Sequence, residues 1–238
     1  MRCAAGALLV LGGVAFAVET PALATFSSLA PGELQEPWRL LTLVDVKGAE
    51  AALVAENGVT VLRVRSVAAA GTAAQSVDAD SHGLALTWRW KVDRVVQAAD
   101  MGRRTGDDYA ARVYVFFDVP RSELPWSTRI KMAAIELIYG KALPTAALCY
   151  VWDNRHPVGT AQWNAYTDRV RMVVLRSGET EAGDWRTKHR RLDADYRAAF
   201  GTSGPLPRVS GIAAGNDTDQ TGERVTAWFG DFRFERSP

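Results

Sequence analysis

The sequence predicts a mostly β protein, built as an antiparallel β-sandwich with one or two short helices. One run of residues alternates between apolar and polar side chains, and seven further runs are rich in strand-forming residues. Segments rich in Gly, Asn and Asp separate most of these runs, as expected of turns. Strands with one apolar face must bury it against another such face, so two packed sheets are expected.

The clearest strand covers residues 84–92, where every second side chain is apolar and Thr87, Arg89 and Lys91 stand between them. This alternation is typical of a half-buried antiparallel strand and places Trp88 and Trp90 on its core face. The other expected strands cover residues 39–46, 60–67, 111–119, 146–152, 169–176, 208–214 and 225–234.

Two segments favour helices. Ser127 is a suitable N-cap for a helix that Gly140 would end. Residues 193–200, closed by Gly201, predict about two further helical turns.

The N-terminus resembles a secretory signal peptide, because a short apolar run follows Arg2 and small residues precede two candidate cleavage sites. We expect cleavage after Ala24, with a cut after Ala17 as the alternative. The run is too short to span a hydrocarbon core of about 30 Å comfortably, so no membrane span is expected after cleavage. The predicted organisation is a signal peptide (1–24), a polar lead-in (25–37) and one sandwich domain (38–238), located in the periplasm or secreted.

Composition narrows the classes of function. The formal net charge is +1, which does not favour a nucleic-acid partner. Without Cys3 of the signal peptide, Cys149 has no partner for an internal disulfide, and its apolar neighbours predict a buried, unreactive thiol. The mature length is sufficient for a substantial core without disulfides.

Several motifs occur together in one order along the chain. They include residues 86–92 (LTWRWKV), 106–108 (GDD), 112–117 (RVYVFF), 150–154 (YVWDN) and 217–222 (DTDQTG). Together they resemble the bacterial family catalogued as domain of unknown function 3047, over nearly all of the mature chain. The resemblance implies an exported β-sandwich, similar in outline to jelly-roll or galactose-binding-like domains, and supplies no reaction.

A carboxylate pair beside a strand is the best candidate site. Asp107 and Asp108 lie in a Gly-flanked loop that leads into the strand bearing Arg112. Adjacent carboxylates can divide acid and base roles or bind a hard cation. The structural alternative is an Asp-Asp turn with one carboxylate paired to Arg112.

A second acidic loop has the opening pattern of a calcium site. Asp217, Asp219, Thr221 and Gly222 occupy positions 1, 3, 5 and 6 of such a loop. Position 12 is Trp228 rather than Glu, which excludes an EF-hand and leaves a looser calcium site or a plain turn. Calcium is therefore a possible ligand, and no cofactor is required.

Aromatic residues next to polar ones could line a ligand groove. Trp152 precedes Asp153 and Asn154, Trp163 precedes Asn164, and Trp185 follows Gly183 and Asp184. We therefore add Trp152, Asp153, Asn154 and Asn164 to Asp107, Asp108 and Arg112 as candidate ligand-binding residues. The alternative is that these tryptophans close the core at strand ends.

The basic run at residues 185–191 has two interpretations. Arg side chains suit phosphate and carboxylate groups. As a strand, however, the run spreads its charges over both faces, which is typical of a solvated edge strand, and we prefer that interpretation.

Three functional hypotheses remain, since the three histidines lack metal-ligand spacing and no nucleophile elbow, Walker loop or dinucleotide motif occurs. The preferred hypothesis is a non-catalytic cell-envelope binding module for glycan or a related polar ligand. The alternatives are a polysaccharide hydrolase or lyase that uses Asp107 or Asp108, and a structural envelope protein that binds another polypeptide.

Overall fold

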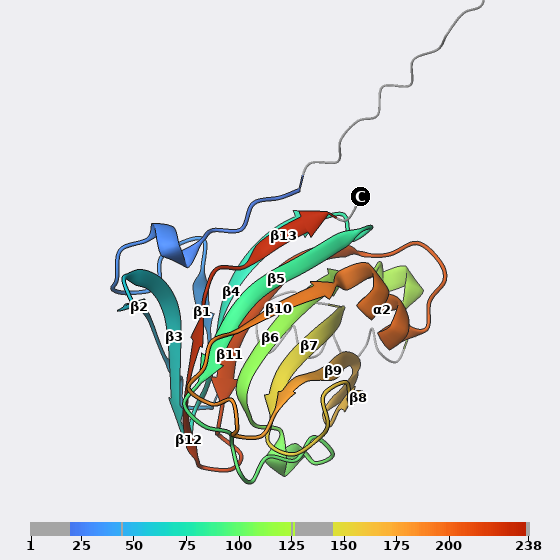
Figure 1. Ribbon diagram of the computed structural model, residues 1–238. Helices are drawn as coiled ribbons and strands as arrows, with labels where there is room; N and C mark the ends of the chain where they lie inside the picture. The colour runs from blue at the N-terminus through green and yellow to red at the C-terminus, as the bar shows by residue number, and fades with distance from the viewer. Residues whose placement is uncertain (1–19, 44, 125, 127–144, 237–238) are drawn as a thin grey trace, which may run out of the picture.

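The structure is a computed structural model that describes residues 20–43, 45–124, 126 and 145–236. Two β-sheets pack face to face around one large apolar core, and α2 (Leu192–Phe200) lies at one end of the sheets (Figure 1). The prediction of a mostly β chain with two sheets is confirmed. No helix in the described ranges is long and apolar enough to cross a membrane.

One sheet has seven strands. In spatial order these are β1 (Arg39–Leu41), β4 (Ala70–Ala79), β11 (Arg208–Asp217), β6 (Tyr109–Asp118), β7 (Ala146–Asp153), β9 (Thr167–Ser177) and β8 (Ala161–Asn164). All its neighbouring strands are antiparallel except β7 and β9. The expectation of a purely antiparallel sheet was therefore wrong at this point, because β8 and β9 form a hairpin that attaches to β7 through β9.

The other sheet has six strands. In order they are β10 (Arg186–Arg191), β5 (Leu84–Val92), β12 (Arg224–Phe229), β3 (Val59–Val67) and β2 (Glu50–Glu56), while β13 (Arg233–Arg236) pairs with β5 beyond the end of β12. The basic run forms β10 at the edge of this sheet, which confirms the edge-strand interpretation.

Large aromatic side chains join the two sheets. Trp88 and Trp90 project inward from β5 and are almost fully buried, as the alternation predicts. Trp88 stacks on Tyr150 of β7 with ring centroids 5.4 Å apart, and Trp90 contacts Trp152 at 5.9 Å. Aromatic pairs contribute beyond their buried area, so these contacts fix how one sheet lies on the other.

The N-terminal part of the chain contributes to the core. A short 3-10 turn (Phe26–Ser28) places Phe26 against Trp38 and Phe232, and Phe26 is fully buried. The segment predicted as a polar lead-in is thus polar in composition but is fixed to the domain by one aromatic ring.

The remaining secondary structure differs from expectation in part. The helix expected at residues 193–200 is α2, and Gly201 ends it in the left-handed conformation. The expected strand at residues 225–234 is divided into β12 and β13, and the one expected at 39–46 is limited to β1. The helix expected after Ser127 lies outside the described residues. Two further 3-10 turns cover Arg104–Gly106 and Arg121–Glu123.

Candidate functional site

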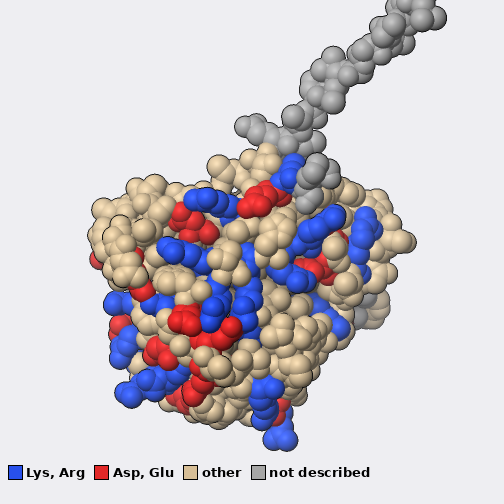
Figure 2. Space-filling model, viewed as in Figure 1, with Lys and Arg blue, Asp and Glu red and all other residues tan. Residues whose placement is uncertain are grey.

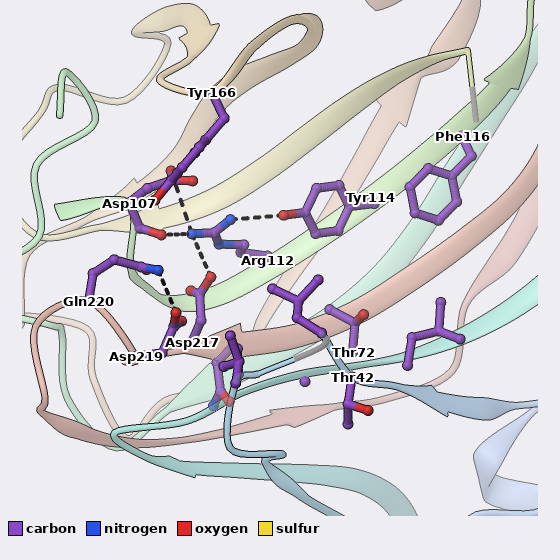
Figure 3. A pocket seen from close by; sticks show the side chains of 16 residues that line it. Thr42, Thr72, Asp107, Arg112, Tyr114, Phe116, Tyr166, Asp217, Asp219 and Gln220 are labelled. Atoms are coloured by element: carbon purple, nitrogen blue, oxygen red, sulfur yellow. Dashed lines mark hydrogen bonds and ion pairs between the residues drawn. The ribbon is translucent and has the colours of Figure 1, made fainter. Parts of the chain in front are cut away.

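The candidate site is a pocket on the outer face of the seven-stranded sheet, with a volume of about 590 Å³. It results from the alternation of β6, in which Val113, Val115 and Phe117 face the core. The intervening side chains, Arg112, Tyr114 and Phe116, therefore point outward and line the pocket (Figure 3). We call this the outer-face pocket.

A buried guanidinium lies at the acidic end of the outer-face pocket. Nη2 of Arg112 is 2.7 Å from Oδ2 of Asp217 on β11 and 3.6 Å from Oδ1 of Asp107. Nη1 donates to the hydroxyl of Tyr114 over 2.9 Å, and Nη2 also donates to the carbonyl oxygen of Asp107. The guanidinium lies 4.6 Å from the ring of Tyr109. These contacts hold the charge in one position.

The partner carboxylate of Arg112 is itself nearly buried. Asp217 accepts a hydrogen bond from the backbone N–H of Tyr109 over 2.9 Å. Burial raises the pKa of Asp217 well above its usual value, despite the opposing effect of Arg112, and the nearby carboxylates of Asp108 and Asp107 raise it further. The affinity of Asp217 for its proton is therefore higher in the folded protein than in the unfolded chain.

The Asp-Asp pair divides its contacts between the pocket and a loop. Asp107 lines the pocket and accepts a hydrogen bond from Nδ2 of Asn164 over 2.8 Å. Asp108 is fully buried and accepts from the backbone N–H groups of Gln220 and Thr221, at 3.4 and 2.7 Å. Asp107 thus lines the pocket as a buried residue whose Oδ1 has no hydrogen-bond partner among the described residues, whereas Asp108 holds the 217–222 loop against the sheet.

Three carboxylates form the group best suited to a cation. Asp108, Asp217 and Asp219 each offer one oxygen, and these oxygens lie within 4.8 Å of one another. Burial raises the pKa of Asp219, and Asp108 adds to that effect. The backbone N–H of Thr221 donates to Asp108 over 2.7 Å, and its hydroxyl oxygen accepts from the backbone N–H of Glu223 over 3.4 Å.

The rest of the outer-face pocket is aromatic and apolar. The rings of Tyr114 and Phe116 are 5.7 Å apart and nearly parallel, at 13°. Tyr166 is half exposed at the tip of the β8–β9 hairpin, and its hydroxyl donates to the carbonyl of Arg104 over 3.0 Å. The wall on the β1 side is formed by Leu41, Thr42, Leu43, Val46, Ala70, Gly71 and Thr72.

Three of the predicted ligand-binding residues lie away from this pocket. Trp152 is 1% exposed and donates from Nε1 to the carbonyl of Gly178, so it belongs to the core. Asp153 is equally buried and accepts from the backbone N–H groups of Arg155 and His156. Asn154 donates to the carbonyls of Gln97 and Ala99. These side chains fix the loop after β7 and do not line the outer-face pocket.

The predicted aromatic residues Trp163 and Trp185 also lie elsewhere. Trp163 contacts Phe200 of α2 at 5.5 Å, and Trp185 lies under Arg89 on the other sheet. The pocket instead uses Tyr114, Phe116 and Tyr166, which we did not select from the sequence. The sequence signal for Tyr114 and Phe116 was the alternation of β6, which places them on the opposite face from the buried Val113 and Val115.

Cys149 is fully buried on β7, as predicted. Burial raises the pKa of this thiol to about 12, which leaves it protonated at neutral pH. It is therefore unsuited to act as a nucleophile.

Comparison with known families identifies the group to which the chain belongs. Residues 36–233 match the family described as "Protein of unknown function (DUF3047)". The chain is therefore a member of that family, as its motifs suggested. The comparison with curated proteins gave no match.

Solved structures of similar layout include glycoside hydrolases. A family 12 xyloglucanase from Bacillus licheniformis aligns with 87% of this chain and 97% of its own, at 8% identity and a TM-score of 0.47. The endoglucanase cel12A from Rhodothermus marinus aligns with 84% of this chain and 92% of its own, at 9% identity and a TM-score of 0.44. The cellulose induced protein Cip1 aligns with 84% of this chain and 91% of its own, at 12% identity and a TM-score of 0.37. These values carry no conclusion about activity.

Replacing Arg112 with Met is expected to lower the free energy of unfolding by about 3–5 kcal/mol at pH 8, because Asp217 and Asp107 lose their cation. The loss of stability should be smaller at pH 5, because a larger fraction of Asp217 is then protonated and needs no cation. Folding raises the pKa of Asp217, so its protonated form stabilises the folded state at low pH. That stabilisation is lost as the pH rises from about 3.9 through the raised pKa. Urea denaturation at both pH values measures this.

Arg65→Met is the matched control, since Arg65 is an exposed residue whose Nη1 lies 3.3 Å from Glu50. Its loss should stay below about 1 kcal/mol at either pH. Equal losses for the two variants would contradict the role given to Arg112.

Calcium at Asp217, Asp219 and Thr221 stays a prediction. Binding to the folded state alone should raise the melting temperature of the full chain with calcium and lower it again with chelator. The Asp219→Asn variant should lose this increase in melting temperature. The Asp168→Asn variant, which changes an exposed residue outside the cluster, should keep it. An increase that persists in Asp219→Asn would place the ion elsewhere.

Proposed function

We propose that this protein is a binding module for a glycan or a related polar ligand, which it holds in the outer-face pocket. The observation that carries the proposal is the parallel pair Tyr114–Phe116 next to the hydrogen-bonding groups of Arg112 and Asp107. Sugar rings have apolar faces and hydroxyl edges, so rings beside fixed polar groups suit them. A jelly-roll, galactose-binding-like outline is part of this proposal.

The charges of the outer-face pocket favour a neutral ligand. Three carboxyl groups line it, from Asp107, Asp217 and Asp219, against the single guanidinium of Arg112. An acidic sugar would meet that excess of carboxylates in a partly buried site and would be repelled. Hydroxyl groups, which both donate and accept, can use the carboxylates and the side chains of Thr42, Thr72 and Gln220.

Binding without catalysis is the better-supported role for these carboxylates. Glycosidases generally need two carboxyl groups on opposite sides of the bond they cut. Here the lining carboxylates lie at one end of the pocket, and the described residues of the β1-side wall contribute none. Both oxygens of Asp217 already have partners, Arg112 and the backbone of Tyr109.

The test is calorimetric titration of the full chain with a panel of neutral and acidic oligosaccharides. We expect one class of neutral oligosaccharide to bind, and Phe116→Ala and Tyr166→Ala each to weaken its Kd about tenfold or more, because stacking and buried area are lost. Trp163→Ala is the control, since Trp163 is an exposed aromatic residue of the same sheet that does not line the pocket.

Two results would count against this function. Equal weakening in Trp163→Ala would mean that the outer-face pocket is not the site. Release of reducing ends from the bound oligosaccharide, abolished by Asp107→Asn, would favour the hydrolase alternative.

We also infer that the protein is exported, with the earlier of the two candidate cleavage sites in use. Leu23 is buried in the core, the carbonyl of Ala24 accepts from Nε1 of Trp38 over 2.9 Å, and the backbone N–H of Ala24 donates to Gln75 over 3.1 Å. A cut after Ala24 would remove these contacts. A cut after Ala17 retains them, so the packing supports that site over the one favoured by sequence alone.

N-terminal sequencing of the protein recovered from the periplasm or medium of an expressing bacterium tests this inference. We expect Val18 as the first residue, and we expect Ala17→Arg to block the cut while Ala24→Arg does not. Thr25 as the first residue would restore the later site. Recovery of the uncut chain from the cytoplasm alone would contradict export.

A further inference from the structure

The outer face of the six-stranded sheet differs in chemistry from the outer-face pocket. Arg63, Arg89 and Lys91 project from its central strands, because these positions alternate with the buried side chains of β3 and β5. Figure 2, viewed as Figure 1, shows Lys and Arg side chains across the middle of this face, with Asp and Glu among them. Of these three cations, Lys91 pairs with Glu56, whereas Arg63 and Arg89 have no carboxylate partner among the described residues. A cation without such a partner is informative.

Arg89 is such a cation. It forms no ion pair with any described carboxylate, whereas Lys91 pairs with Glu56 and Arg65 lies 3.3 Å from Glu50. Its position is nevertheless fixed. The guanidinium lies 4.5 Å from the ring of Trp185, and a Cβ atom at Gly230 would come within 2.4 Å of Nε of Arg89. The stem of Arg89 thus occupies space that only a glycine leaves open.

A shallow pocket of about 360 Å³ lies beside Arg89, and we call it the Arg89 pocket. Its lining residues come from the 3-10 turn, β3, β5, β10 and the segment around β13. They are Ser27, Val59, Thr87, Trp88, Arg89, Thr187, Asp231 and Arg233.

The polar groups of the Arg89 pocket converge by strand register. Thr187 of β10 pairs with Arg89, and Arg233 of β13 pairs with Thr87, so these four residues, which all line the pocket, occupy adjacent positions in the sheet. The Thr87 hydroxyl oxygen is buried and has no hydrogen-bond partner among the described residues. Such a group costs free energy when it stays unpaired, which indicates a missing partner.

The one acidic residue of the Arg89 pocket is already engaged. Asp231 accepts from the backbone N–H of Ser27 over 2.9 Å and also from the Ser27 hydroxyl. Its distance to Nη2 of Arg233 is 3.7 Å, outside hydrogen-bonding range. Asp231 offsets one of the two guanidinium charges of the lining, so the Arg89 pocket keeps a net positive charge, and Arg89 has no carboxylate partner among the described residues.

We propose that the Arg89 pocket binds one oxyanion group, a phosphate, sulfate or carboxylate, carried by a ligand. Arg side chains contact such groups through two parallel N–H donors, and threonine hydroxyls complete the shell. This site lies on the opposite sheet from the outer-face pocket, has the opposite charge and does not depend on the proposed glycan function. A substitution can therefore abolish ligand binding at one pocket and leave ligand binding at the other pocket unchanged.

The test uses the full chain with inorganic phosphate, inorganic sulfate and glucuronate, each against sodium chloride of equal ionic strength. We expect at least one oxyanion to raise the melting temperature above the chloride value, and the three arms identify which chemistry is preferred. Arg89→Gln and Arg233→Gln should each weaken the apparent Kd about tenfold or more, because a charged hydrogen bond is lost.

Arg65→Gln is the control, since it removes the same charge from the same face outside the Arg89 pocket. An equal loss of affinity in Arg65→Gln would reduce the effect to general charge and overturn the site. So would an oxyanion response no larger than that of chloride in the wild-type protein. Because Arg89 packs against Gly230 and Trp185, Arg233→Gln decides the result if Arg89→Gln does not fold.

Discussion

The outer-face pocket depends on the interactions of one buried group, the guanidinium of Arg112. It connects β6 to β11 through Asp217, holds the loop before β6 through Asp107, and orients Tyr114. A buried charge of this kind is tolerated only when its partners are in place. Its partners in turn use backbone N–H groups and Asn164, so the loops at this end of the sheet form one connected network. The polar wall of the pocket is therefore held in place by contacts within the protein itself.

The two sheets use their outer faces for different chemistry. Both bury their inner faces in a common aromatic core, which leaves the outer faces free to carry side chains selected for other reasons. On the seven-stranded sheet, carboxylates and aromatic rings surround one guanidinium. On the six-stranded sheet, guanidinium groups exceed carboxylates around the Arg89 pocket. The acidic outer-face pocket and the basic Arg89 pocket therefore lie on opposite sides of the same core.

Sequence reasoning succeeded where a local pattern determines the structure. The alternation of residues 84–92 identified β5 with its bounds, and Gly201 marked the end of α2. It failed for β4, whose small residues carry no strand signal and which forms because β11 and β1 pair with it. Arg112 was selected beside its neighbour Asp107, but its closer partner, Asp217, lies more than a hundred residues away. Trp152 was misplaced because a polar neighbour in sequence does not expose a strand residue.

The parallel pairing of β7 and β9 has a consequence for how the pocket assembles during folding. The β8–β9 hairpin closes through the two residues Ala165 and Tyr166, a local contact that forms quickly. Pairing with β7 joins segments that no tight turn can connect, and it requires a longer loop to close first. Tyr166 at the hairpin tip and Asn164 reach Arg104 and Asp107 across 62 and 57 residues of chain. The pairs of β4 with β11 and of β3 with β12 join residues more than a hundred positions apart. Loop closure therefore costs less entropy for this corner of the pocket than for the centres of the two sheets.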